Sequence, residues 1–236
     1  ECRPIEPVID AGGAAKLRVA IAAFGRQAAR ATLLVHTAGG ERGVEHVCEP
    51  GAPAAIDVDC GPAPPGLGRA YVELRIDGET VDLAETAWYA RGAKVPASTP
   101  LAFERNYFTL GGRAMFLFGA DNYGNDFDPH TAGPACWDRL FDASRDLGLQ
   151  IYEILLPPAF DTTPGLLAQV RAQGELLAAK GLIYMPGFLI GHNVAVNEAR
   201  MQAEEAAVKA GVAALRDLPR AIWYLNGDFQ WQEDDP

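Results

Sequence analysis

The second half of the chain alternates between short apolar runs and stretches with helical periodicity. A parallel sheet joined by right-handed helical crossovers has this order of elements, since each helix covers the sheet between two strands. Strands buried on both faces have near-continuous apolar sequences. Four runs fit that description, and they predict the strands Met115–Ala120, Leu149–Leu156, Leu182–Met185 and Ala221–Leu225. Four such strands fit half of a barrel or a small doubly wound sheet.

Three helices are expected between these strands. The first is Ala135–Leu147, which is followed by a glycine, and the second is Pro164–Lys180, with proline at its first position and Gly181 after its end. Proline at the start of a helix and glycine just beyond the end are the usual boundary residues. The third helix begins after a capping residue, either Asn193 or Asn197, and ends before Pro219.

Residues 1–95 have the sequence pattern of a β domain. Short alternating runs are separated by turns rich in glycine and proline, and Asp77-Gly78 between two such runs predicts a β-hairpin. Several strands at this spacing suggest an Ig-like β-sandwich, which we expect to be structural or to shape a neighbouring cleft. The predicted organisation is therefore a sandwich domain at 1–95, a linker at 96–104 and an α/β domain at 105–236.

The net charge of −11 and the pI of about 4.8 argue against nucleic acid and against an anionic membrane surface as partners, because both need a basic face. No apolar run is long enough for a transmembrane helix. The negative net charge is compatible with a neutral substrate such as a sugar. The first residues do not resemble a signal peptide and lack a methionine, so we expect the chain to start after a processing site or at a shortened end.

The four cysteines form no C-x-x-C pair, so neither a zinc site nor a thioredoxin-like site is expected. Cys48 and Cys60 either bridge neighbouring strands or are separate buried thiols, and both interpretations stay open. A bridge would place the protein in an oxidising compartment. Asp126 and Asp128 have the spacing of calcium-loop ligands, but no glutamate completes the pattern, which favours a solvated loop. No metal and no cofactor is expected.

Two motifs give the chain a resemblance to a known family. Residues 107–123 comprise a hairpin, an apolar strand and Asp121-Asn122, and residues 222–228 read Ile-Trp-Tyr-Leu-Asn-Gly-Asp. The first stretch resembles the start of the (β/α)8 barrel in retaining glycoside hydrolases, and the β domain before it resembles the Ig-like domain of β-galactosidase and β-glucuronidase relatives. The second stretch is similar to a motif of apiosidase-like relatives. The resemblance implies an Ig-like β-sandwich followed by the first half, four strands, of a TIM barrel.

The resemblance also implies a role for Asp228. The family places its general acid/base carboxylate after the fourth strand, which is the position of Asp228, and its nucleophilic glutamate after a seventh strand that this chain does not contain. Asn-Gly-Asp is also good turn chemistry, so a turn residue is the competing interpretation. Glu233 is a weaker rival for the acid. Glu153 lies inside the second strand and is expected to be a structural carboxylate.

Other residues after strand ends are candidates for sugar contacts, because carboxylates and amides hold hydroxyl groups and aromatic faces cover sugar C–H surfaces. Trp223 alternates within a strand and is expected in the core. The candidates are Asp121, Asn122, His192, Asn226 and Trp231.

The first functional hypothesis is a retaining glycosidase of O-glycosyl bonds, with a carbohydrate substrate and with the remaining half of the barrel supplied by the same or another polypeptide. A non-catalytic carbohydrate-binding or scaffold protein is the alternative, and a small doubly wound domain with another ligand is a third. No nucleotide-binding glycine motif and no G-x-S-x-G follows a strand. A secreted or periplasmic location is expected, with the cytoplasm as the alternative. The sugar and its linkage are left open.

Overall fold

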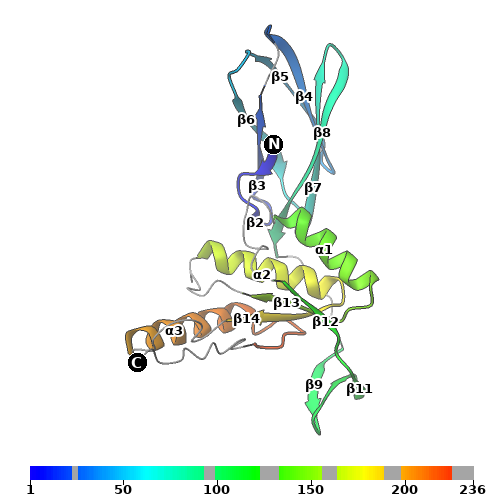
Figure 1. Cartoon of the computed structure of the whole chain (residues 1–236), viewed down its shortest axis with the longest axis vertical. Helices are drawn as coiled ribbons and strands as arrows, with labels where there is room; N and C mark the ends of the chain where they lie inside the picture. Colours follow the sequence, from blue (N-terminus) through cyan, green and yellow to red (C-terminus); the bar gives the residue numbers. More distant parts are fainter. Residues whose placement is uncertain (23–25, 93–98, 123–132, 156–163, 189–197, 225–236) are drawn as a thin grey trace, which may run out of the picture. The chain divides into compact units, whose positions relative to one another are not determined.

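The computed structural model describes residues 1–22, 26–92, 99–122, 133–155, 164–188 and 198–224 (Figure 1). The chain divides into two compact units. The first consists of Glu1–Lys94 with Pro129–Cys136, and the second of Val95–Asp128 with Trp137–Pro236. The domain boundaries inferred from the sequence stay predictions.

The first unit contains two β-sheets, drawn in blue to cyan-green in Figure 1. The three-stranded sheet has the order β1-β3-β6, and the five-stranded sheet has the order β2-β8-β7-β4-β5. The strands of these sheets are β1 Cys2–Pro4, β2 Val8–Asp10, β3 Ala14–Ile21, β4 Ala29–Thr37, β5 Gly40–Cys48, β6 Ala54–Pro62, β7 Gly66–Ile76 and β8 Glu79–Arg91.

Both sheets contribute to one hydrophobic core. Along β3 buried and exposed residues alternate strictly, which directs Leu17 and Val19 inward. Leu33 and Val72 from the five-stranded sheet belong to the same core cluster. The β-rich character expected for the first part of the chain is confirmed.

The hairpin predicted at Asp77-Gly78 is confirmed. It connects β7 and β8, which pair in antiparallel register. Asp77 and Gly78 have φ angles of 52° and 84°, and a two-residue turn with positive φ at both positions matches the twist of a hairpin.

The two cysteines considered as a pair are not bonded to each other. None of the four cysteines forms a disulfide, with Cys48 buried in the five-stranded sheet and Cys60 partly buried in the other sheet. Burial raises the pKa of the Cys60 thiol, and it raises the pKa of Cys2 to about 11. The interpretation as separate thiols therefore holds, and the cysteines give no argument for an oxidising compartment.

The second unit contains a hairpin sheet, a parallel sheet and helices. The hairpin sheet has the order β11-β10-β9, and the parallel sheet has the order β12-β13-β14. The strands are β9 Leu101–Glu104, β10 Tyr107–Leu110, β11 Arg113–Met115, β12 Gly119–Asn122, β13 Ile151–Leu155 and β14 Ile183–Gly187, and the helices are α1 Pro134–Asp146, α2 Pro164–Ala179 and α3 Glu198–Leu215.

The alternation predicted from sequence is confirmed for three strands, because β12, β13 and β14 pair in parallel register. The first two helices lie within one residue of their predicted bounds. The third helix begins at Glu198, directly after Asn197, which is itself outside the described residues. The fourth predicted strand is represented by two parallel bridges, Tyr184 to Ala221 and Gly187 to Tyr224.

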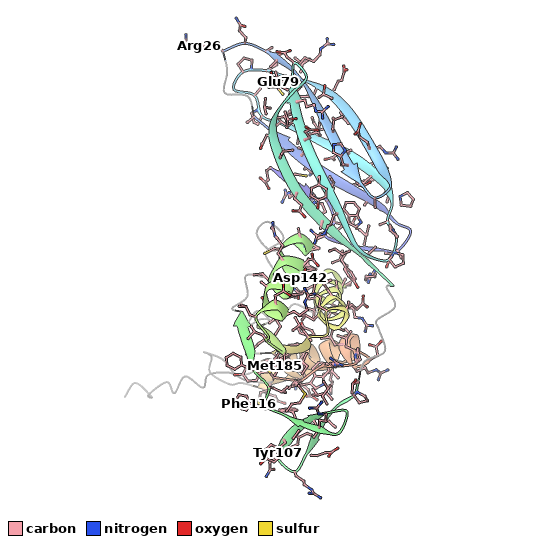
Figure 2. The ribbon with its side chains drawn as sticks, turned by 90° about the vertical axis from the view of Figure 1, so that its right-hand side faces the viewer. Arg26, Glu79, Tyr107, Phe116, Asp142 and Met185 are labelled. Atoms are coloured by element: carbon pink, nitrogen blue, oxygen red, sulfur yellow. The ribbon has the colours of Figure 1, made fainter. Side chains whose placement is uncertain are left out.

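The predicted strand Met115–Ala120 is wrong in its bounds. Met115 ends β11 by pairing with Phe108, whereas the parallel strand begins only at Gly119. Between them Phe116 is 86% exposed and Phe118 is 62% exposed, and Figure 2 labels Phe116 at the surface. A single apolar run is thus divided between two sheets, because its first residue, Met115, pairs in antiparallel register with β10.

No helix in the described part of the chain is both long and apolar enough to span a membrane.

Candidate functional site

The carboxyl ends of the parallel strands share one edge of the sheet in the second unit. Asn122 at the end of β12 pairs with Ile154, and Ile154 pairs with Pro186 near the end of β14. The bridge from Gly187 extends this edge to Tyr224. In parallel α/β folds, ligands bind outside this edge, because the loops that follow the strands converge there. The edge is therefore the candidate functional site.

One face of this sheet packs against helices. Tyr152 contacts Phe141 of α1 with ring centroids 4.8 Å apart, and Tyr184 pairs in register with Tyr152. A Cβ added to Gly174 of α2 would lie 3.0 Å from the Tyr184 ring. Both tyrosines therefore face the helices, in agreement with Figure 1, where α1 and α2 lie on the same side of the strands.

The opposite face carries Glu153. Successive residues of a strand point to opposite faces, so Glu153 points away from the helices that Tyr152 contacts. Its register partners are Asp121 on β12 and Met185 on β14, which Figure 2 labels. Glu153 and Met185 are both partly buried, whereas Ile183 on the same face is only 2% exposed. This face is therefore apolar at Ile183 and Met185 and carries a carboxylate at Glu153.

A buried ion pair holds the first helix to the end of the second. Lys180 follows α2, and its Nζ lies 2.7 Å from Asp138 Oδ1 and 2.6 Å from Asp142 Oδ1 of α1. The Lys180 and Asp138 side chains are only 10% and 7% exposed, whereas Asp142 is 37% exposed. This ion pair was not among the features predicted from the sequence, although Asp138 and Asp142 are one helical turn apart.

A second charged group connects α2 with the segment after α3. Arg171 donates to Glu175 at 2.7 Å, to the Ala214 carbonyl at 2.8 Å and to both carboxylate oxygens of Asp217. The Arg171 guanidinium lowers the pKa of Asp217, chiefly through the hydrogen bond, and the two carboxylates raise the pKa of Arg171. Both charged groups fix the helices, and through them the strands that form the candidate edge.

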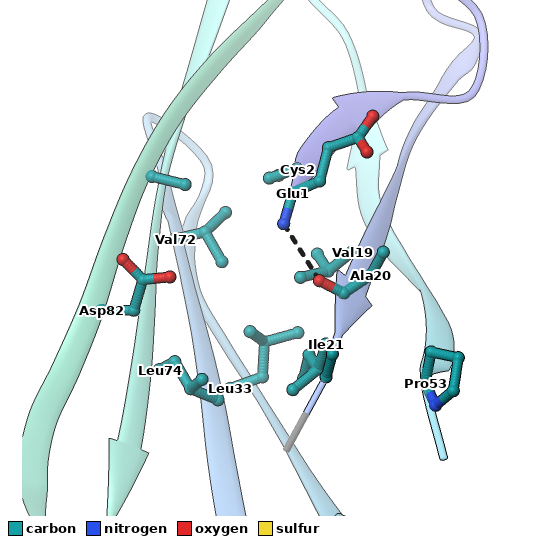
Figure 3. Close-up of a pocket in the computed structure, with 12 residues that line it drawn as sticks. Glu1, Cys2, Val19, Ala20, Ile21, Leu33, Pro53, Val72, Leu74 and Asp82 are labelled. Atoms are coloured by element: carbon teal, nitrogen blue, oxygen red, sulfur yellow. Dashed lines mark hydrogen bonds between the residues drawn. The ribbon is translucent and has the colours of Figure 1, made fainter. Parts of the chain in front are cut away.

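Two of the hollows in the described part of the first unit are distinct from this edge. One has a volume of about 390 Å³ and opens between the two sheets beside Val19, Leu33 and Val72, with Asp82 at its margin (Figure 3). The other has a volume of about 610 Å³, and its lining includes Tyr71 and Trp88. Neither contains a site residue predicted from the sequence.

Most of the predicted site residues lie outside the described part of the chain. Asp121 and Asn122 are placed in β12 by their backbone. Trp223, expected in the core, stacks on Phe188 with ring centroids 6.1 Å apart. The predicted residues outside the described ranges are His192, Asn193, Asn226, Asp228, Trp231 and Glu233.

Within the described residues, no group of three or more histidine, cysteine, aspartate or glutamate side chains could hold a metal ion.

Comparison with known proteins gives structural resemblances only. No family model and no curated protein matches the chain. Among solved structures, it resembles the exo-chitosanase CsxA of Amycolatopsis orientalis, with 14% identity, a TM-score of 0.39 and coverage of 95% of this chain and 28% of that one. It also resembles the β-glucuronidase of Bifidobacterium dentium, with 12% identity, a TM-score of 0.39 and coverage of 94% of this chain and 36% of that one. The resemblance to the β-D-mannosidase of Dictyoglomus thermophilum has 13% identity, a TM-score of 0.40 and coverage of 94% of this chain and 29% of that one.

The chain thus resembles solved glycoside hydrolases and spans about a third of their length or less. Because these TM-scores are below 0.5, the case for a function rests on the residues and strand register of this chain.

Proposed function

We propose that the polypeptide carrying this chain is a glycoside hydrolase acting on O-glycosyl bonds. In this proposal the first unit is an Ig-like β-sandwich, and the second contains the first half of a TIM barrel. The other strands of the barrel come from the same or another polypeptide. The substrate is a carbohydrate, and the protein is secreted or periplasmic.

One observation carries the proposal. The parallel bridge between Gly187 and Tyr224 puts the fourth strand segment beside β14, with its carboxyl end at the edge where β12 to β14 also end. Asp228 follows Tyr224 so closely in the chain that their Cα atoms are at most about 14 Å apart even when fully extended. The short covalent connection to Tyr224 therefore supports Asp228 as a residue of the proposed site, since parallel α/β folds bind ligands at this edge.

Retaining hydrolysis needs two carboxyl groups about 5–5.5 Å apart. Asp228 would protonate the leaving oxygen and later deprotonate the attacking water. The nucleophile would be a glutamate after the seventh strand, outside this chain. The sugar would be held by Asp121, Asn122, His192 and Asn226, with Trp231 as its aromatic platform.

The test is Asp228→Asn in the full polypeptide, assayed on aryl glycosides and on unactivated glycosides. Removal of the acid should lower kcat on unactivated substrates by at least about 100-fold, since general acid catalysis contributes that much. Azide should partly restore turnover of an aryl glycoside, because it replaces the water that Asp228 activates.

Glu233→Gln is the matched control, because it makes the same chemical change at the rival carboxylate and should leave kcat within about threefold. If Asp228→Asn retains full activity, Asp228 is not the acid. If the unaltered polypeptide binds oligosaccharides but hydrolyses none, the carbohydrate-binding alternative is correct.

A further inference from the structure

We infer that Glu153 contacts the substrate, as a residue that selects sugars by accepting hydrogen bonds from their hydroxyl groups. This inference rests on the proposed glycosidase function and adds a residue to its site. The sequence alone suggested only a structural carboxylate at this position.

The Glu153 side chain lies on the face of the sheet that would line the inside of a barrel. Tyr152 and Ile154, the neighbours of Glu153 along β13, are 3% and 0% exposed, and Tyr152 packs against α1. Strand geometry therefore places the Glu153 carboxylate on the face away from the helices. In a barrel this is the inner face, which leads to the ligand site at the carboxyl edge.

A charged side chain on a central strand of a parallel sheet is energetically costly. Central strands of parallel sheets are normally apolar, because both of their faces are covered. A carboxylate there loses hydration, and its burial is unfavourable unless it has polar partners. Glu153 has at least one hydrogen-bonding or electrostatic interaction within the chain, which supplies such a partner. A residue whose only role was to fill this face would be apolar, as Ile183 and Met185 are.

Glu153 is the central residue of its strand. Ile151 precedes Glu153 on the same face, and Leu155 is the last residue of β13. Glu153 is thus nearer to the carboxyl edge than the apolar Ile151, and Asp121 lies in register beside it on β12. Glu153 is therefore two residues from the end of its strand on the side of this edge. A carboxylate has two acceptor oxygens, which match a pair of adjacent sugar hydroxyls.

A structural role and a substrate-contacting role predict different outcomes. Loss of a structural carboxylate lowers activity on every substrate by a similar factor. Loss of a contact to one hydroxyl lowers activity only on substrates that carry this hydroxyl, so the mutation and the removal of the hydroxyl are not additive.

The experiment measures kcat and KM of the full polypeptide and its Glu153→Gln variant on the best aryl glycoside and on its monodeoxy analogues. We expect a loss in kcat/KM of roughly 10- to 100-fold on the parent glycoside. On one monodeoxy analogue the same substitution should cost less than about threefold. Glu153→Ala should give the same pattern of losses, which would show that the effect comes from removal of the carboxylate and not from the introduced glutamine.

Glu175→Gln is the control for structural effects, because Glu175 is a buried glutamate of α2 bonded to Arg171. Its losses should be equal on all substrates. Equal losses for Glu153→Gln across all analogues would overturn the inference while leaving the glycosidase function intact. Absence of hydrolysis of any glycoside by the unaltered polypeptide would instead overturn the proposed function, and the inference with it.

Discussion

Lys180→Met tests how the helices are held on the parallel sheet. Lys180 binds Asp138 and Asp142 through its ammonium group, with Lys180 10% exposed and Asp138 7% exposed. The substitution keeps the unbranched apolar stem and removes only the charge, so it leaves the Asp138 carboxylate buried without its cation.

Removal of one partner from a buried ion pair costs about 3–5 kcal/mol. We expect the lower end of this range, about 3 kcal/mol, because Asp142 is 37% exposed and Asp138 has a further interaction within the chain. The measurement is urea unfolding followed by tryptophan fluorescence, for which Trp137 in α1, 1% exposed, is a local reporter.

Two variants complete this test. Asp142→Asn should cost less than about 1 kcal/mol, since a partly exposed ion pair contributes little. The double variant Lys180→Met with Asp138→Leu should return to within about 1 kcal/mol of the original stability, because an apolar pair often replaces a buried ion pair at no cost. A loss of less than about 1 kcal/mol for Lys180→Met alone would refute the reasoning.

Two further predictions concern the same unit. Gly174→Ala should destabilise this unit by about 1–3 kcal/mol, because the new Cβ would lie 2.4 Å from Leu218 Cδ1. Gly165→Ala in the same helix should raise stability by up to about 1 kcal/mol, because its new Cβ would have no atom within 4 Å. Equal urea midpoints for the two variants would contradict this prediction. Asp217 has a pKa below its ordinary value because of Arg171, so it stabilises the fold at pH values above about 4, and this contribution is lost as the pH falls through its lowered pKa. Asp217→Asn should therefore make the urea midpoint less dependent on pH below about 4. The free energy of unfolding involved is less than about 1 kcal/mol, since the Asp217 side chain is 64% exposed. An unchanged pH dependence would argue against the interaction with Arg171.

Local patterns predicted the helices well. α1 and α2 match their predicted ranges, because proline at the first position and glycine after the last are boundary signals that operate within a few residues. Gly148 and Gly181 indeed have φ angles of 81° and 79°, in the left-handed region where a residue with a Cβ is strained.

Pairing between strands that are distant in the sequence was harder to predict. The apolar run from Met115 to Ala120 predicted one strand, yet its first residue pairs with Phe108 and the parallel strand begins at Gly119. An apolar run shows that a segment is suited to burial, but it does not show which strand it pairs with. The choice between the two sheets depends on the register of β10 and β13, which the local sequence does not contain.

At the candidate site, too, local features could be predicted from the sequence, whereas contacts between distant residues could not. The sequence by itself determined the order of three parallel strands and of the helices between them, since this order depends on neighbouring residues. Only the tertiary structure decided that Lys180 reaches Asp138, and that Glu153 lies between Asp121 and Met185 on the face away from the helices. Such contacts depend on strand register and helix packing, which are set by the free energy of the whole fold.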